Sequence, residues 1–179
     1  MDCIAYIDGG RVPGTKLTTI GGFILKDGAE IARYYEIGGV GSNADAEWQS
    51  LIRCMGVAVE HNVSSVHIKT DFRPVADMLR TEYEILQSMV SELECNPDNR
   101  GLRKTLIIRT KQRFGSVKTL REWIEKNKTC LKATDSFPGK YKKEIIGAME
   151  SLEVTLELIP REANYAADEL CRIARKEEI

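Results

Sequence analysis

The sequence CIAYIDGG, residues 3–10, decides the fold of this chain. Its first six residues are mostly apolar and rich in residues that favour strands, so they predict a short β-strand over 3–8. The strand is expected to end on Asp8, because the two glycines that follow break the pattern. An acidic side chain there is a candidate functional residue, since ligand sites of such sheets form at the carboxyl ends of the strands.

The rest of the chain alternates strands and helices. Turn residues and short apolar runs predict four further strands, at 20–25, 29–37, 65–70 and 154–159. Apolar periodicity predicts helices at 44–61, 74–94, 116–127, 141–152 and 164–175. Short turns make the first three strands antiparallel, whereas a strand–helix–strand crossover requires a parallel pair. We therefore expect an α/β protein with a mixed five-stranded sheet, three antiparallel strands followed by parallel strands, flanked by helices.

The composition limits the class of protein. The 179 residues are 42% hydrophobic and 30% charged, which suits a single domain over 1–179 and excludes a disordered chain. No apolar run is long enough to span a membrane, and the first residues show no secretory signal. The five cysteines are far apart and form no CxxC pair, so we expect reduced thiols and a cytoplasmic location.

Basic residues are concentrated in one part of the chain. Residues 100–143 contain 14 Lys or Arg and 3 Asp or Glu, a balance of +11, while the remainder balances at −12. The segment 84–139 is predicted to be a basic, mostly helical insert, with a short strand at 106–108. Such a block indicates a polyanion contact, and a solvated surface without a specific role is the alternative. Trp123 has the helical spacing of a core residue, which we favour over stacking on a base.

Four acidic residues fall at the ends of predicted elements: Asp8, Glu47, Asp71 and Asp168. Neighbouring parallel strands lie about 5 Å apart, so Asp8 and Asp71 are expected side by side. Carboxylates at that distance repel unless a cation lies between them, and Mg²⁺ prefers oxygen ligands. Four converging carboxylates could hold two ions for in-line phosphoryl displacement. Taken singly, each acid also has a structural explanation, such as a turn, a helix cap or a solvated helix surface.

The motifs around these acids occur in a recognisable order. They are AYIDGG (5–10) with GGFIL (21–25), NADAEWQSLI (43–52), IKTD (68–71) and PREANYAADEL (160–170). Together they resemble the motifs of type 1 ribonuclease H, and the last resembles that of archaeal-like and reverse-transcriptase-associated members. The resemblance covers residues 3–80 and 141–175; no single motif is specific, and the order of all of them carries the likeness.

The resemblance implies a ribonuclease H-like fold and metal-dependent cleavage of the RNA strand of RNA–DNA hybrids. It implies two Mg²⁺ ions as cofactors, with Mn²⁺ as an alternative. Carried over to this chain, Asp8 would bridge both ions and Asp168 would complete the ion on the nucleophile side. Glu47 and Asp71 would complete the ion on the leaving-group side.

The resemblance also implies contacts with the nucleic acid. Asn43, which we expect to cap its helix, matches a position that contacts nucleic acid, and the backbone of Gly9 lies where the hybrid approaches. Specificity would come from 2′-hydroxyl contacts and duplex shape. The basic insert would add phosphate contacts with a steep salt dependence, and we assign these to Lys126, Lys128 and Lys132.

The chain departs from the family pattern in three places. Many bacterial members carry a histidine in the loop before the last aspartate, and this chain has none there, so Glu162 is the candidate auxiliary residue. Gly10 stands where a serine is common. The insert 84–139 does not align with the family's basic handle, and it is either an enlarged handle or a docking element for a protein partner.

Two other functions therefore stay open beside the hybrid ribonuclease. One is a non-catalytic module of the same fold that binds nucleic acid or protein, favoured by the insert and the missing histidine. The other is a nuclease that acts on a different nucleic-acid substrate. A requirement for 2′-hydroxyl groups in the substrate would distinguish the hybrid ribonuclease from a nuclease that acts on another nucleic acid.

Overall fold

The computed structural model describes residues 3–131 and 138–177. The chain divides into two compact units, which we call the sheet unit (Met1–Met78 with Ser136–Ile179) and the helical unit (Leu79–Asp135). The helical unit corresponds to the insert expected at 84–139. It begins five residues earlier, at Leu79, and ends four residues earlier, at Asp135. Each unit is described by itself below.

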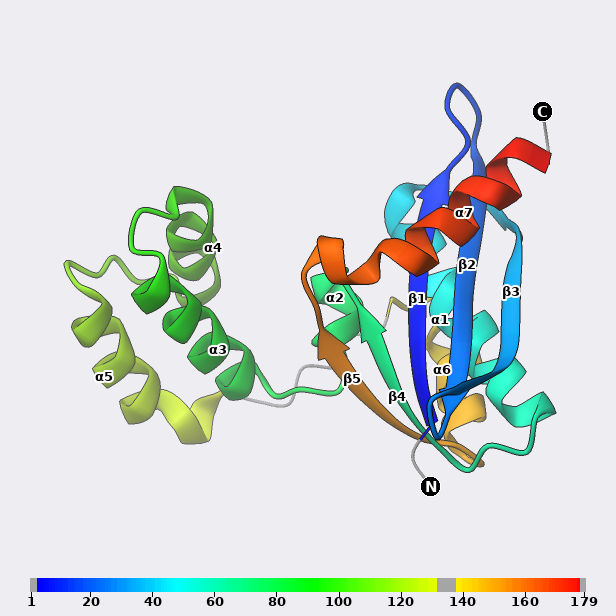
Figure 1. The fold of residues 1–179 in the computed structure, drawn as a ribbon. Helices are drawn as coiled ribbons and strands as arrows, with labels where there is room; N and C mark the ends of the chain where they lie inside the picture. Colours follow the sequence, from blue (N-terminus) through cyan, green and yellow to red (C-terminus); the bar gives the residue numbers. More distant parts are fainter. Residues whose placement is uncertain (1–2, 132–137, 178–179) are drawn as a thin grey trace. The chain divides into compact units, whose positions relative to one another are not determined.

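The sheet unit contains the predicted five-stranded mixed sheet, in the order β3-β2-β1-β4-β5 (Figure 1). Its strands are β1 (Cys3–Arg11), β2 (Leu17–Lys26), β3 (Ala29–Val40), β4 (Ser65–Thr70) and β5 (Glu153–Leu158). β1 pairs antiparallel with β2, and β2 pairs antiparallel with β3. β4 is parallel to both β1 and β5, which confirms the predicted fold class.

β1 is longer than the sequence predicts. It does not end at Asp8 but runs on through both glycines to Arg11. The reason is its antiparallel partner, because β2 pairs with β1 as far as Arg11 and Thr18 and so satisfies the backbone beyond Asp8. Asp8 therefore projects from within a strand.

Helices cover both faces of this sheet. α1 (Asn43–Glu60) and α6 (Lys142–Met149) lie on one face, and α7 (Tyr165–Glu177) crosses the other (Figure 1). The short α2 (Arg73–Ala76) follows β4, and a 3-10 turn, η2 (Arg161–Asn164), precedes α7. The buried core includes Ile7, Ile24, Leu51, Met55 and Ile68.

The start of α1 differs by one residue from the expectation. Ser42, not Asn43, is the N-cap, because its hydroxyl accepts a hydrogen bond from the backbone N–H of Asp45. The carboxylate of Asp45 in turn accepts from the backbone N–H of Ser42, which completes a capping box. Asn43 is thereby the first residue of the helix.

The helical unit has its own hydrophobic core. Its elements are α3 (Glu82–Cys95), α4 (Arg100–Thr110), α5 (Val117–Asn127) and the 3-10 turn η1 (Lys128–Cys130). Their buried apolar residues pack together: Ile85, Leu86, Met89, Val90, Leu93, Leu102, Leu106, Leu120 and Ile124. Trp123 is half-buried against this core, as its helical spacing predicts.

Two predictions in this part of the chain are wrong. The helix expected over 74–94 is two helices, because Thr81 and Glu84 form a capping box that starts α3 afresh. The strand expected at 106–108 is part of α4, since a three-residue apolar run does not separate strand from helix.

Among the described residues, no helix combines the length and the apolar character that a membrane span requires.

Candidate functional site

Strand register places Asp8 and Asp71 side by side. β1 and β4 run parallel, with Tyr6 opposite Lys69. The same offset continued by two residues puts Asp8 opposite Asp71, which directly follows Thr70 at the end of β4. The adjacency predicted from the order of elements is therefore a consequence of the parallel pairing.

Glu47 joins them from the first helical turns of α1. That part of the helix packs directly on the backbone of Gly9, where an added Cβ atom would clash with the backbone of Ala46 and Glu47. Only glycine at position 9 lets the helix approach β1 so closely. Gly9 thus positions Glu47, besides lining the cavity where we expect it to contact nucleic acid.

The three acids form a compact group. One carboxylate oxygen from each of Asp8, Glu47 and Asp71 lies within 4.8 Å of the others. Asp8 is 7% exposed and Glu47 is 9% exposed, while Asp71 is half-buried. Three carboxylates at such distances, largely removed from water, repel one another strongly when all are charged.

The pKa of Asp8 reflects this environment. Burial raises the pKa of Asp8 from 3.8 to about 6, and a hydrogen bond from Cys171 offsets part of the shift. The negative charges of Asp71 and Asp168 also contribute to this rise. Folding therefore opposes ionisation of this carboxyl group.

The pKa of Glu47 is shifted further. The pKa of Glu47 is raised to about 9, first by burial and then by the charges of Asp8 and Asp71. The Arg161 cation and a hydrogen bond from the backbone of Gly9 lower it in part. Its Oε2 atom is buried without a hydrogen-bond partner among the described residues. A buried oxygen without a partner is costly unless a ligand satisfies it.

Asp168 lies beside this group and not within it. It is in the first turn of α7 and lines the same cavity, and its charge acts on Asp8. Its carboxylate is 2.7 Å from Nη2 of Arg172 and 3.9 Å from Nη2 of Arg161. The structure thus brings three of the four predicted acids together and holds the fourth next to them, paired with arginine.

These acids line a cavity of about 400 Å³. Four arginine side chains share its wall with the four carboxylates: Arg11, Arg161, Arg172 and Arg175. Carboxylates offer ligands to a cation, while guanidinium groups offer donors to an anion such as phosphate. A cavity with both can hold a cation and a phosphate together.

Asn164 is a positioning residue that the sequence alone did not reveal. Its side chain is 1% exposed, and its amide nitrogen donates to the carbonyl of Ile7, at 2.8 Å, and to Oδ1 of Asp71, at 2.9 Å. One side chain at the end of η2, directly before α7, therefore ties this segment to β1 and to the residue that follows β4. The available signal was its position in the PREANYAADEL motif, four residues before Asp168.

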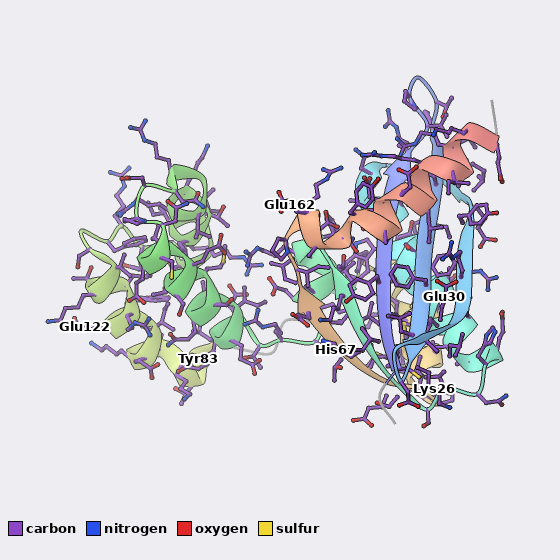
Figure 2. All side chains as sticks on the ribbon, viewed as in Figure 1. Lys26, Glu30, His67, Tyr83, Glu122 and Glu162 are labelled. Atoms are coloured by element: carbon purple, nitrogen blue, oxygen red, sulfur yellow. The ribbon has the colours of Figure 1, made fainter. Side chains whose placement is uncertain are left out.

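Two other predicted site residues differ in their placement. Asn43 lines the cavity, as expected for a contact with nucleic acid. Glu162 is exposed on η2 and is outside the residues that line the cavity (Figure 2). Its auxiliary role stays a prediction.

The predicted phosphate contacts of the insert belong to the helical unit. Lys126 and Lys128 are exposed, and Nζ of Lys128 lies 4.5 Å from the centre of the Tyr83 ring. Lys132 lies outside the described residues. Two arginines of this unit are paired with acids, Arg121 with Glu94 at 2.7 Å and Arg109 with Glu82 at 3.6 Å.

Comparison with solved structures shows which fold this is. Ribonuclease H1 of the halophilic archaeon Halobacterium salinarum NRC-1 superposes with a TM-score of 0.61 at 15% identity, over 99% of both chains. The N-terminal ribonuclease H domain of rv2228c from Mycobacterium tuberculosis gives a TM-score of 0.58 at 14% identity, over 98% of this chain and 99% of that one. LC11-RNase H1, solved in complex with an RNA/DNA hybrid, gives 0.57 at 18% identity, over 98% of both.

These similarities show a ribonuclease H fold, as the motif resemblance predicts. No family model matches the sequence, and no curated protein matches it significantly. At this level of identity the likeness concerns the fold, so the function must be argued from the site.

Proposed function

We propose that this protein is a metal-dependent endonuclease that hydrolyses the RNA strand of RNA–DNA hybrids. The observation that carries the proposal is the group formed by Asp8, Glu47 and Asp71, whose oxygens lie within 4.8 Å of one another in a cavity lined by arginines. The ribonuclease H fold supports it, since a neighbour of that fold was solved with an RNA/DNA hybrid.

The group fits a divalent cation better than it fits protons. Without a cation, the pKa of Asp8 rises to about 6 and that of Glu47 to about 9, and Oε2 of Glu47 is buried without a partner. Mg²⁺ or Mn²⁺ would satisfy these oxygens and remove the repulsion. Asp8, Glu47 and Asp71 are the ligands we assign, with Asp168 as the fourth carboxylate for a second ion.

Two ions held there would activate a water molecule and stabilise the leaving oxygen of a displacement at phosphorus. The residues of the chain prepare the site for this chemistry. Asn164 holds Asp71 against β1, and Gly9 lets Glu47 reach the group. The arginines on the cavity wall balance the charge of the entering phosphodiester.

Substrate choice is assigned to groups that can detect a 2′-hydroxyl. The carboxamide of Asn43 and the backbone of Gly9 line the cavity and offer donors and acceptors. Contacts of this kind separate RNA from DNA without reading the sequence. The exposed lysines of the helical unit, with Lys132, are assigned phosphate contacts that raise affinity.

A binding module without turnover is the second candidate, and one observation favours it. Asp168, the fourth carboxylate, is paired with Arg172 at 2.7 Å. If the ion pair between Asp168 and Arg172 persists when nucleic acid binds, the carboxylate of Asp168 is not available as a ligand for a second metal ion. A module of this kind would hold hybrids, or a protein partner of the helical unit, without cutting anything.

A cleavage assay separates these candidates. One end-labelled sequence is prepared as RNA–DNA hybrid, double-stranded RNA, single-stranded RNA and double-stranded DNA, and each is incubated with Mg²⁺, Mn²⁺ or EDTA. Asp71→Asn tests the site, because asparagine can still accept the hydrogen bond from Asn164. Asp27→Asn is the matched control, since Asp27 lies in a turn with φ 52° that asparagine also adopts.

We expect metal-dependent cutting of the RNA strand of the hybrid alone, abolished in Asp71→Asn and retained in Asp27→Asn. Cutting of DNA, or of RNA without a DNA partner, would replace the hybrid by another substrate. Tight binding without any cutting, under every ion, would favour the binding module.

A further inference from the structure

Arg175 lies in the last turn of α7, on the cavity wall beside Gly10. A Cβ atom added to Gly10 would lie 2.5 Å from Nη2 of Arg175 and 3.4 Å from Oγ1 of Thr19. The guanidinium therefore occupies the space that a side chain at position 10 would take. The glycine at this position, where the sequence motif commonly has serine, leaves the arginine room to reach the cavity.

Arg175 also differs from the other arginines of the cavity near α7 in its ion pairs. Arg172 and Arg161 both lie against Asp168. No carboxylate lies within 4.0 Å of Arg175 among residues 3–131 and 138–177, and its Nε is buried without a hydrogen-bond acceptor. Oγ1 of Thr19, on the other side of the same gap, is buried and unpaired as well. Unsatisfied polar groups of this kind call for a ligand or for water.

The position of Arg175 relative to the carboxylates suggests what that ligand is. Gly10 is two residues beyond Asp8 on an extended strand, a separation of about 7 Å. A nucleic-acid strand that runs along β1 with one phosphodiester at the carboxylates would present the next phosphodiester close to Gly10. The guanidinium can meet it, because no acid within the described residues 3–131 and 138–177 forms an ion pair with Arg175.

We infer that Arg175 binds a backbone phosphate adjacent to the one at the carboxylates. The absence of a side chain at Gly10 leaves the guanidinium the space it needs for this contact. This inference rests on the proposed function for its substrate class. A guanidinium suits the role because its planar fork donates two parallel hydrogen bonds to phosphate oxygens. Such a contact fixes the register of the strand and carries no base specificity.

Binding measurements without metal test the inference apart from catalysis. The dissociation constant of a short RNA–DNA hybrid is measured in EDTA over a series of salt concentrations. The variants are Arg175→Ala, Arg175→Lys, Gly10→Ala and the double variant Gly10→Ala with Arg175→Ala. Lys176→Ala, the next residue of the helix and outside the cavity lining, is the control for loss of one positive charge. Thermal melts confirm that each variant folds.

For Arg175→Ala we expect the dissociation constant to rise about tenfold and the salt slope to fall by about one unit. Arg175→Lys should keep the slope and recover part of the affinity. Gly10→Ala should weaken binding by displacing the guanidinium, and in the double variant it should add nothing to the loss already caused by Arg175→Ala.

The results distinguish failure of this inference from failure of the proposed function. Unchanged affinity and slope in Arg175→Ala would overturn the inference, even if the wild type cuts hybrids. An Arg175-dependent slope in a protein that cuts nothing would support it and overturn the proposed activity. Additive losses in the double variant would overturn the role of Gly10, and a wild type that binds no hybrid would overturn both proposals.

Discussion

The two units of this chain place charged residues in different ways. The sheet unit holds Asp8 and Glu47, and the helical unit holds Glu94 and Arg121. The first two are buried with no cation within 4.0 Å among the described residues. The second two are exposed at the surface and paired at 2.7 Å. An exposed pair contributes little to stability, whereas buried like charges oppose folding.

This difference in burial and pairing of charges indicates which unit carries the candidate functional site. The helical unit buries apolar residues and leaves charge at its surface, as an ordinary small helical domain does. The sheet unit keeps carboxylates where they destabilise the metal-free fold, and such a cost persists where a ligand offsets it. The predictions below test this contrast.

The largest effect is expected from Asp8→Asn. Removing this proposed metal ligand should lower hybrid cleavage by at least about 10³-fold. The same substitution should stabilise the metal-free protein at pH 8, because the pKa of Asp8 is raised from 3.8 to about 6. The stability that the protonated group provides is fully present below about pH 4 and is lost as pH rises through 6.

Denaturant unfolding in EDTA measures this second effect. Asp8→Asn should exceed the wild type in free energy of unfolding by on the order of 2 kcal/mol at pH 8. The gain should shrink as the pH is lowered to 4. A variant that is less stable than the wild type at pH 8 would show that the Asp8 carboxylate is stabilised by something other than a bound cation.

Metal binding should depend steeply on pH. Folding holds protons on Asp8 up to about pH 6 and on Glu47 up to about pH 9, and a cation must displace them. Thermal melts should therefore show a larger stabilisation by Mg²⁺ or Mn²⁺ at pH 9 than at pH 6. Affinity should rise by about tenfold per pH unit where one proton is released.

Glu47→Gln provides the control for that dependence. It keeps the shape of the side chain and removes the proton with the higher pKa, so metal stabilisation should be weaker and should no longer increase above pH 7. An unchanged pH profile in this variant would exclude Glu47 as the group that titrates.

Asn164→Ala and Asn127→Ala compare two asparagines, one in each unit. Each donates to a backbone carbonyl, Asn164 to Ile7 at 2.8 Å and Asn127 to Trp123 at 2.7 Å. Asn164 also holds Asp71, so its loss should lower activity by about 10- to 100-fold and weaken metal affinity. Asn127→Ala should leave activity unchanged. Equal activity in the two variants would show that Asn164 does not position Asp71 for the reaction and contributes only to packing.

Much of the sheet unit could be predicted from the sequence. Turn residues and periodicity locate its strands and main helices, and the crossover rule then makes β4 parallel to β1. The adjacency of Asp8 and Asp71 follows from that topology alone. The continuation of β1 beyond Asp8 could not be predicted, because it depends on hydrogen bonds from β2 and not on the local preference of two glycines.

The residues missed in the site share one physical reason. Asn164 and Arg175 lie beside residues about 160 positions away, Ile7 and Gly10, and the placement of α7 across the sheet brings them together. Local sequence shows only a polar residue in a helix or a turn. The boundary between the units shows the opposite case, because the apolar stripe continues across the capping box at Thr81 and local sequence therefore predicts one helix over 74–94 in place of α2 and α3.

The smallest effect is expected in the helical unit. Replacing Lys126, Lys128 and Lys132 together with alanine should weaken hybrid binding severalfold and reduce the salt slope by up to about three units. Thermal stability should change little, because Lys126 and Lys128 are exposed and surface charges contribute little to folding.

Lys26→Ala is the comparison in the sheet unit, since Lys26 lies at the end of β2 that pairs with the start of β1 (Figure 2) and is not among the residues that line the cavity. Its salt slope should match that of the wild type. If the triple variant also keeps the wild-type slope, the basic helical unit faces something other than the hybrid. The protein-docking alternative would then be the reading to pursue, with the sheet unit alone responsible for nucleic acid.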